Sequence, residues 1–289
     1  RIDFNFALSS GYELTVAMED YLDYVLDLPE TRVVGLFLET SRYPQKLIAA
    51  FKKAIARNIP IVVLKVGRTA LAAEMALSHS GALAGTDKSY SAVFDRYGVQ
   101  RVEDMDQLAT ALIMFAQPQA PAAGGIACLH DSGGERQLLI DLADQYSVPL
   151  ARLDAPILDR LKGLLDPGLP AVNPLDGWGA GGGDAPANMA ACFTALLEST
   201  DTALGAVVHD RGPNSEVYPS YMEYLHQAQG ATGKPVFLVA NRQGSGSDSL
   251  AITSTQGGFP VIDGVSQFLV GARCLLDYRD FQQQPAQRL

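Results

Sequence analysis

Asn58-Ile59-Pro60-Ile61-Val62-Val63-Leu64-Lys65 is the stretch of sequence that decides the fold class. Asn-Ile-Pro is typical of a turn, and the run that follows it, residues 61–65, is typical of a short strand covered on both faces. Residues 43–56, just before the turn, have the spacing of a helix with one apolar side. Residues 32–38 form another short apolar run, which also favours a strand covered on both faces. A strand, a helix and a second strand in this order predict a parallel sheet with a right-handed crossover.

The same alternation of apolar runs and helical patterns continues along the chain. Further helices are expected at residues 69–77, 90–97, 105–116, 135–146, 187–198, 218–229 and 265–278, and further strands at 99–102, 125–130, 204–209 and 235–240. Between the two halves, residues 117–124 are rich in Pro and Ala without periodicity, as in a linker. We therefore predict two three-layer α/β/α domains with parallel sheets, at residues 1–117 and 124–289.

Composition argues against several classes of function. A net charge of −10 disfavours a general nucleic-acid binder, which needs a basic face to displace counterions. The three cysteines show no CxxC spacing, so neither a metal site nor a disulfide framework is indicated, and Cys128 and Cys192 are expected to be buried. No apolar stretch approaches the roughly 20 residues of a membrane helix, and there is no leader of the signal-peptide kind. We expect a cytoplasmic protein without a membrane partner, and the start at Arg1 is typical of a piece of a longer chain.

Ser78-His79-Ser80-Gly81-Ala82-Leu83-Ala84-Gly85 is the strongest candidate for chemistry. Small residues and two glycines follow the histidine, so the backbone can come close to a bulky anion. The alternative is a helix end capped by glycine, with His79 as an incidental polar residue. The order of the residues, however, closely resembles the phosphohistidine loop of the succinyl-CoA synthetase superfamily, and most of all that of the NDP-forming acyl-CoA synthetases.

The resemblance extends along the whole chain, because several motifs occur in the family's order. They are SSGYE at residues 9–13, DLPET at 27–31, LKVGRT at 64–69, SGG at 132–134 and NPLD at 173–176. Tyr12 replaces the family's usual Asn, and residues 131–136 (DSGGER) depart from its usual SGGPG loop, which bears on the identity of the substrate. The resemblance implies the two central, flavodoxin-like CoA-ligase domains of such an enzyme. It also implies that the first domain is truncated, because the family places a companion helix upstream of Arg1.

The resemblance further implies roles for individual residues. His79 would carry a phosphoryl group, since a neutral imidazole nitrogen is a good nucleophile near neutral pH and a phosphoramidate readily passes its phosphoryl group on. Glu39 matches the family's glutamate that orients this histidine by holding one ring nitrogen as N–H; the alternative is a solvated residue at a strand end. Contacts to phosphate or substrate are expected from Ser10, Gly11, Ser80, Gly81, Ser132, Gly133, Gly134 and Asn173.

Other candidates follow predicted strands, where open α/β sheets bind their ligands. The SGG turn at 132–134 opens a helix whose N-terminal N–H groups suit a phosphate, although any strand-to-helix turn can use glycine. Trp178 either lines an acyl pocket or belongs to an ordered surface loop. His130 and His209 lie beside aspartates, but no Gly-x-Ser-x-Gly elbow accompanies them, which favours structural roles. His226 is expected at the surface.

The family reaction interconverts acyl-CoA, ADP and phosphate with a carboxylic acid, CoA and ATP. The resemblance therefore implies CoA, ADP or ATP and Mg²⁺ as ligands of a full-length enzyme, with CoA-binding and ATP-grasp domains in the same chain or a partner subunit; a homodimer is compatible with it. The chain alone is expected to bind none of these tightly and to be inactive. The rival interpretation is an acyl-CoA-sensing regulatory module of a fused protein acetyltransferase. The sequence names neither the acid nor the choice between ADP and GDP.

Overall fold

The structure, a computed structural model, describes residues 2–69, 71–72, 86–179, 184–210, 218–242 and 249–284. The chain divides into two compact units. The N-terminal unit comprises Ile2–Ala116 together with the residues from Asp277 onward, and the C-terminal unit comprises Gln117–Leu276. Each unit contains one parallel sheet, which confirms the predicted α/β class. Among the described helices, none combines the length and the apolar character that crossing a membrane requires.

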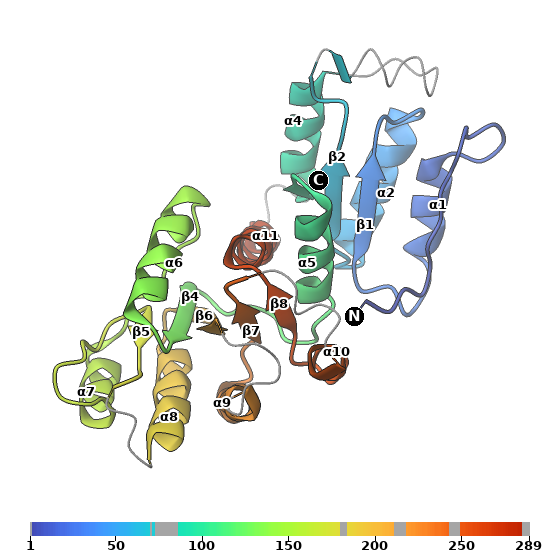
Figure 1. Ribbon diagram of the computed structural model, residues 1–289. Helices are drawn as coiled ribbons and strands as arrows, with labels where there is room; N and C mark the ends of the chain where they lie inside the picture. Colours follow the sequence, from blue (N-terminus) through green and yellow to red (C-terminus); the bar gives the residue numbers. More distant parts are fainter. Residues whose placement is uncertain are drawn as a thin grey trace. The chain divides into compact units, whose positions relative to one another are not determined.

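The sheet of the N-terminal unit has the strand order β1-β2-β3, formed by Val34–Leu38, Ile61–Lys65 and Gln100–Val102 (Figure 1). The helices on one of its faces are α1 (Met18–Val25), α2 (Pro44–Ala56) and α4 (Asp87–Tyr97), which share one apolar core with the strands. Helix α5 (Met105–Phe115) packs on the opposite face, where Leu112 lies against Gly35. The predicted strand at residues 61–65 is therefore confirmed, with helices on both sides of it.

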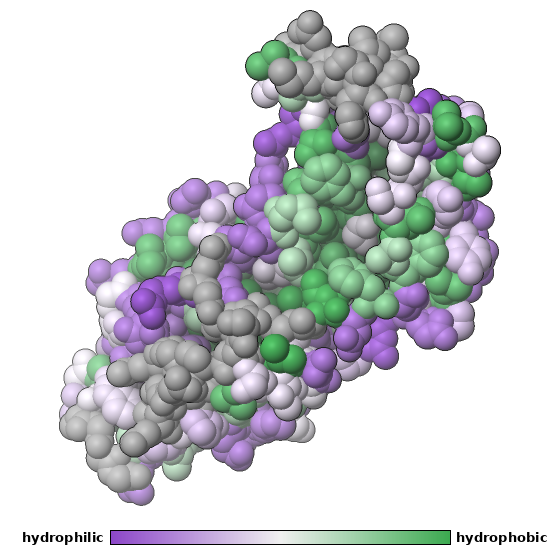
Figure 2. All heavy atoms as spheres, turned by 45° about the vertical axis from the view of Figure 1, so that its right-hand side comes forward, coloured by the Kyte–Doolittle hydropathy of each residue, from purple (hydrophilic) through white to green (hydrophobic). Residues whose placement is uncertain are grey.

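The strand predicted at residues 32–38 is fully covered on one face only, so the prediction that both faces are covered is wrong. Val34, Leu36 and Leu38 are buried, whereas Gly35 and Phe37 alternate with them and are exposed, Phe37 to 57%. The reason is that β1 is an edge strand among the described strands and that α5 lies chiefly over β2. Figure 2 shows apolar surface on this unit, and its exposed large apolar side chains up to β1 are Phe4, Leu8, Tyr12, Leu14, Val16, Tyr24 and Phe37.

The end of helix α11 (Val265–Gln283) completes the N-terminal unit. The ring of Tyr278 stands edge-on to Phe115, with 5.7 Å between the ring centroids. Phe281 lies over Gly98, the residue that ends α4 in a left-handed conformation with φ of +64°. A Cβ atom at position 98 would come within 2.4 Å of the Phe281 ring, so this position requires glycine for both space and conformation.

The sheet of the C-terminal unit has the strand order β5-β4-β6-β7-β8. In chain order its strands are β4 (Gly125–His130), β5 (Leu175–Asp176), β6 (Thr202–His209), β7 (Val236–Ala240) and β8 (Val261–Asp263). One face carries α7 (Ala155–Leu164), α8 (Ala185–Glu198), α9 (Tyr218–Thr232) and α10 (Ser249–Gln256); the other carries α6 (Gly133–Gln145) and the first part of α11 (Figure 1). This unit is thus a three-layer α/β/α structure.

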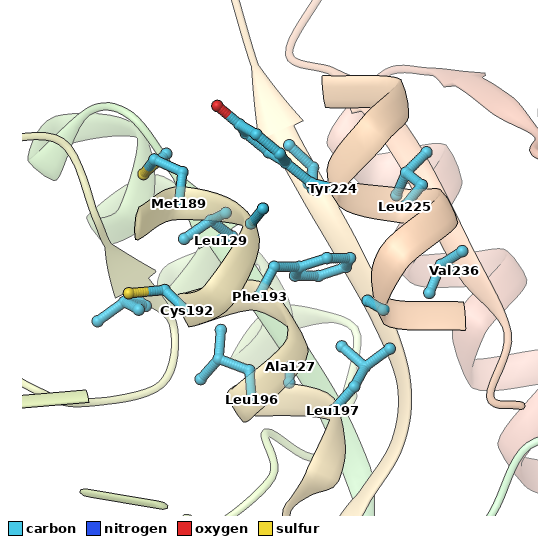
Figure 3. Packing of buried hydrophobic residues seen from close by; sticks show 14 of the residues in the cluster. Ala127, Leu129, Met189, Cys192, Phe193, Leu196, Leu197, Tyr224, Leu225 and Val236 are labelled. Carbon is cyan, nitrogen blue, oxygen red and sulfur yellow. The ribbon is translucent and has the colours of Figure 1, made fainter. Parts of the chain in front are cut away.

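The core of the C-terminal unit is built around Phe193 of α8, which is fully buried (Figure 3). Gly205 in the adjoining strand lets this helix approach closely, because a Cβ atom there would lie 2.4 Å from a methyl carbon of Leu197. Cys128 and Cys192 are buried, as predicted, and burial raises the pKa of both thiols, that of Cys192 to about 11. Both thiols are therefore protonated at neutral pH and act as small apolar residues.

Candidate functional site

The predicted catalytic residue His79 and its neighbours Ser80 and Gly81 lie outside the described residues. The other predicted site residues are described, and all of them except Asn173 fall at the carboxyl ends of the two parallel sheets. This is the edge at which open α/β sheets bind ligands.

The predicted binding residues Ser10 and Gly11 lie in a loop organised by Glu13. One carboxylate oxygen of Glu13 accepts hydrogen bonds from the Ser10 hydroxyl at 2.9 Å and from the Met18 N–H at 3.1 Å. The other pairs with Arg42 Nε at 3.1 Å, and Arg42 also donates to the Tyr12 carbonyl at 3.0 Å. Gly11 and Glu13 have φ values of +58° and +52°, so the loop turns sharply. Because Arg42 follows β1, these contacts hold the loop at the carboxyl end of the sheet.

Glu39 comes directly after β1, and the segment that follows it is fixed from two sides. Glu19, a buried residue of α1, accepts hydrogen bonds from the Ser41 hydroxyl and from the Tyr43 N–H, the latter at 3.2 Å. From α4, the hydroxyl of Tyr90 accepts a hydrogen bond from the Ser41 N–H at 2.9 Å. The same hydroxyl lies 3.3 Å from the Thr40 hydroxyl. The backbone that carries the partly exposed Glu39 carboxylate is therefore held in place by neighbouring helices.

Lys65, the last residue of β2, brings a positive charge to the same edge. It is the register partner of Leu38, so Lys65 and Glu39 stand at the ends of adjoining strands. Burial lowers the pKa of the Lys65 ammonium, while Asp87 and, more weakly, Glu39 oppose this shift. Asp87 itself is paired with Arg101 at 2.6 Å, and this hydrogen bond holds the pKa of the Asp87 carboxyl below its ordinary value.

The predicted SGG turn of the C-terminal unit does open a helix. Ser132 is the extended N-cap residue of α6, its hydroxyl makes no capping hydrogen bond, and Gly133 and Gly134 begin the helix. Two carboxylates lie nearby: a Cβ atom on Gly133 would be 3.1 Å from Asp176 Oδ2, and Asp131 precedes the N-cap. Glycine at position 133 thus leaves room for a carboxylate beside the positive end of the helix dipole.

Asn173 is engaged with the backbone of the C-terminal unit. Its Oδ1 accepts a hydrogen bond from the Cys128 N–H at 3.0 Å, and its Nδ2 donates to the carbonyls of Ile126 and Ala151, both at 2.9 Å. These bonds use both amide hydrogens, so Asn173 holds strand β4 against its neighbouring segment. Its contact with phosphate or substrate stays a prediction.

The remaining histidines and the tryptophan are placed as follows. His130 and His209 are buried at the ends of β4 and β6, and burial lowers the pKa of His130 to about 4, so this ring is neutral at pH 7. His226 is exposed, as predicted, with its ring 3.9 Å from that of Phe259. Trp178 is 39% exposed. No group of three or more His, Cys, Asp or Glu side chains in the described part of the chain is arranged to hold a metal ion.

Lys65, Tyr90 and Glu19 are site residues that the sequence reasoning missed. Lys65 could have been selected from the sequence, because a charged residue at the end of a continuous apolar strand lies at the ligand-binding edge of the sheet. No sequence pattern pointed to Glu19 or Tyr90, since each contacts the loop after β1 from a helix that is distant in sequence. Glu19 lies 22 residues from Ser41, and Tyr90 lies 49 residues from it.

Comparisons with known proteins agree with this architecture. Residues 1–115 match the family described as the succinyl-CoA ligase-like flavodoxin domain. The chain is 32% identical over 202 residues to a trans-feruloyl-CoA synthase from an unknown prokaryotic organism, covering 70% of this chain and 28% of that protein. It is 29% identical over 236 residues to an ADP-forming acetate–CoA ligase of Archaeoglobus fulgidus, covering 81% of this chain and 32% of that ligase.

A solved structure shows the same fold over nearly the whole chain. The dinucleotide-forming acetyl-coenzyme A synthetase 1 of Ca. Korarchaeum cryptofilum, in complex with phosphate and ADP, superposes with a TM-score of 0.81 at 19% identity, over 96% of this chain and 59% of that one. The chain is thus related to ADP-forming CoA ligases, and it spans about a third or less of the length of these curated relatives.

Proposed function

We propose that this chain is the central portion of an NDP-forming acyl-CoA synthetase that passes a phosphoryl group through His79. The overall reaction interconverts acyl-CoA, ADP and phosphate with a carboxylic acid, CoA and ATP. Support comes from the relationship to ADP-forming CoA ligases and from one observation in the structure: the Glu39 carboxylate stands at the carboxyl end of the sheet on a backbone held by Glu19 and Tyr90. A carboxylate held in this way suits the orientation of an imidazole.

The proposed chemistry runs in three balanced steps. An oxygen of phosphate attacks the thioester carbonyl, and the thiolate of CoA leaves, so that an acyl phosphate forms. One imidazole nitrogen of His79 then attacks phosphorus, the carboxylate of the acid leaves, and Glu39 stabilises the proton on the other ring nitrogen. Finally an oxygen of ADP takes the phosphoryl group, which regenerates the neutral histidine and forms ATP.

Cofactor and partner requirements belong to the same proposal. The full-length enzyme would bind CoA, ADP or ATP and Mg²⁺ through CoA-binding and ATP-grasp modules, in the same chain or in a partner subunit. Two of the related ADP-forming acetate–CoA ligases, both from Pyrococcus furiosus, are named as alpha subunits. We expect the isolated 289-residue chain to form no ATP from acyl-CoA, ADP and phosphate, and clear turnover would contradict this part of the proposal.

The decisive experiment tests the histidine itself. The chain is incubated with acetyl phosphate, the acyl phosphate of the second step, and acid-labile phosphate is located by mass spectrometry at neutral to alkaline pH. We expect label at His79, none in His79→Asn, and a rate at least about tenfold lower in Glu39→Gln, since an orienting and charge-stabilising carboxylate is lost. His226→Asn is the matched control on an exposed histidine and should leave the label unchanged.

Two outcomes would count against the proposal. If no histidine of the wild type is labelled, or if His79→Asn is labelled as strongly as the wild type, then His79 does not carry the phosphoryl group. Saturable binding of acyl-CoA without any phosphohistidine would instead favour the rival function, the acyl-CoA-sensing module of a fused acetyltransferase.

A further inference from the structure

Lys65 is a buried cation at the ligand-binding edge that the proposed phosphoryl transfer does not yet use. Only 3% of the residue is exposed, and the four strand residues before it, Ile61–Leu64, are apolar and buried. Removing an ammonium group from water costs free energy unless other groups compensate for it. The identity of those groups therefore indicates what the position is built to hold.

The contacts that Lys65 makes within the described part of the chain leave it without a carboxylate partner. Its nitrogen donates to the Val66 carbonyl and lies 4.7 Å from the centroid of the Tyr90 ring, a cation–π arrangement. Asp87, the acid whose charge acts most strongly on the ammonium, pairs with Arg101 instead. The ammonium is thus positioned and partly compensated, but no described anion neutralises it by direct contact.

The same aromatic residue sets the spacing between Lys65 and Glu39. The face of the Tyr90 ring carries the ammonium, while the hydroxyl of that ring holds the Ser41 N–H at 2.9 Å, two residues after Glu39. Adjoining parallel strands lie about 4.8 Å apart, and Lys65 is in register with the residue before Glu39. Lys65 and Glu39 therefore stand at the ends of adjoining strands, and Tyr90 contacts both the ammonium and the segment that follows Glu39.

We propose that Lys65 is a binding group for the phosphoryl anion that enters this edge of the sheet, as inorganic phosphate or as the phosphoryl group of an acyl phosphate. A lysine ammonium is a point charge with three donors, and it binds phosphate oxygens in many sites. The anion supplies the direct counter-charge that the described contacts of Lys65 lack. The identity of the ligand rests on the proposed function; the cationic site rests on the contacts of Lys65.

Binding of inorganic phosphate to the 289-residue chain, measured by isothermal titration calorimetry, tests this directly. Lys65→Met keeps the length and the apolar stem of the side chain and removes the charge; we expect it to weaken phosphate binding at least tenfold. Lys234→Met is the matched control in the other unit, because Lys234 is also a partly buried lysine whose nitrogen donates to backbone carbonyls, those of Leu197 at 2.6 Å and Ser199 at 3.0 Å. That variant should bind phosphate within twofold of the wild type.

A kinetic readout separates a binding role from a merely structural one. With acetyl phosphate as donor, Lys65→Met should raise the donor concentration that gives half the maximal rate of His79 labelling, and Lys65→Arg should recover part of this loss. Circular dichroism and thermal melting establish that each variant is folded. If Lys65→Met does not fold, Lys65→Gln takes its place, since it keeps a donor without a charge.

The results distinguish this inference from the proposed function. Equal phosphate affinity in folded Lys65→Met and wild type overturns the role of Lys65, whatever happens at His79. A wild-type chain that binds phosphate through Lys65 but never forms phosphohistidine overturns the proposed function and leaves the cationic site supported.

Discussion

The phenolic oxygen of Tyr221 donates a hydrogen bond to Asp131 Oδ2 at 2.7 Å, joining helix α9 to the turn that opens α6 across 90 residues of sequence. Tyr221 is buried, and its ring also stacks on His209, with the centroids 4.9 Å apart. The carboxylate that precedes the candidate phosphate-binding turn is thus held by a residue from the opposite face of the sheet.

Replacing Tyr221 by Phe should lower the free energy of unfolding of the C-terminal unit by about 2 kcal/mol, because a hydrogen bond to a charged group is lost inside the fold. Tyr224→Phe is the matched control. Tyr224 is equally buried on the same helix, and burial, with a smaller contribution from Asp131, raises its pKa to about 12, yet its hydroxyl makes no such hydrogen bond with any residue that the structure describes. Tyr224→Phe should lower the free energy of unfolding by well under half as much as Tyr221→Phe. Urea unfolding followed by the fluorescence of Trp178, the only tryptophan of the chain, reports on this unit. Equal effects of the two substitutions would contradict the role given to Tyr221.

Acid should destabilise the C-terminal unit through His130. Burial lowers the pKa of this ring from 6.5 to about 4, so between these values the unfolded chain binds a proton that the folded chain does not. The contribution of His130 to the free energy of unfolding is therefore complete above about pH 6.5 and falls as the pH decreases below that value. Between pH 7 and pH 5 the loss due to this one group should be about 2 kcal/mol. Urea titrations at both pH values should show a smaller loss for His130→Leu, which has nothing to protonate. A variant with the same pH dependence as the wild type would contradict the assignment.

Two glycines of the C-terminal unit should respond to alanine in opposite directions. Gly124 has φ of +95°, and a Cβ atom there would meet the Asp201 carbonyl oxygen at 1.9 Å; Gly124→Ala should cost more than about 2 kcal/mol, since backbone has to move. Gly163 lies exposed inside α7 with nothing within 4 Å of that position, so Gly163→Ala should add about 0.5–1 kcal/mol. The same fluorescence measurement compares them. If Gly124→Ala leaves the free energy of unfolding unchanged, the backbone at residue 124 is less close to the Asp201 carbonyl than described.

The loop that carries Ser10 and Gly11 should loosen when Glu13 is replaced by Ala. The substitution removes the ion pair with Arg42 and two hydrogen bonds, and it puts alanine at a φ of +52°, so we expect the N-terminal unit to lose about 2–3 kcal/mol. Glu13→Gln keeps an acceptor oxygen, so it should lower the free energy of unfolding by less than Glu13→Ala. Lys46→Ala breaks the exposed pair with Asp20 and should leave the free energy of unfolding nearly unchanged, because water and salt screen the pair. Hydrogen exchange at α1 measures the difference; equal protection in Glu13→Ala and wild type would rule out this role.

The elements that could be predicted from the sequence are those with a strong periodic signal. Strands β2 and β4 were expected at residues 61–65 and 125–130 and lie there, because a short, continuous apolar run is typical of a strand buried on both faces. Helices α1, α7 and α10 and strands β5 and β8 were missed. The two strands are only two and three residues long, so no alternation can be seen in them. The open face of β1 could not be predicted, because exposure at an edge depends on which elements lie beside the strand.

The candidate site was predicted only in outline. The family resemblance, together with a position after a predicted strand, selected Glu39 and the turn at residues 132–134, since parallel sheets bring their carboxyl ends to one edge. The contacts that fix Glu39 come from helices α1 and α4, and sequence spacing carries no information on which helix side chains reach a given loop. Asn173 shows the opposite case, in which a residue selected for binding holds backbone groups of its own unit.

The placement of Phe281 over Gly98 sets a condition on biosynthesis. Ribosomes deliver the chain from its first residue onward, so residues 2–116 emerge long before the aromatic residues that complete their packing, Tyr278 and Phe281. The N-terminal unit, although its synthesis begins first, therefore completes its packing only after residues 278 and 281 have been made. A chain that lacks Tyr278 and Phe281 would expose the apolar surface on which these two rings pack to chaperones and proteases.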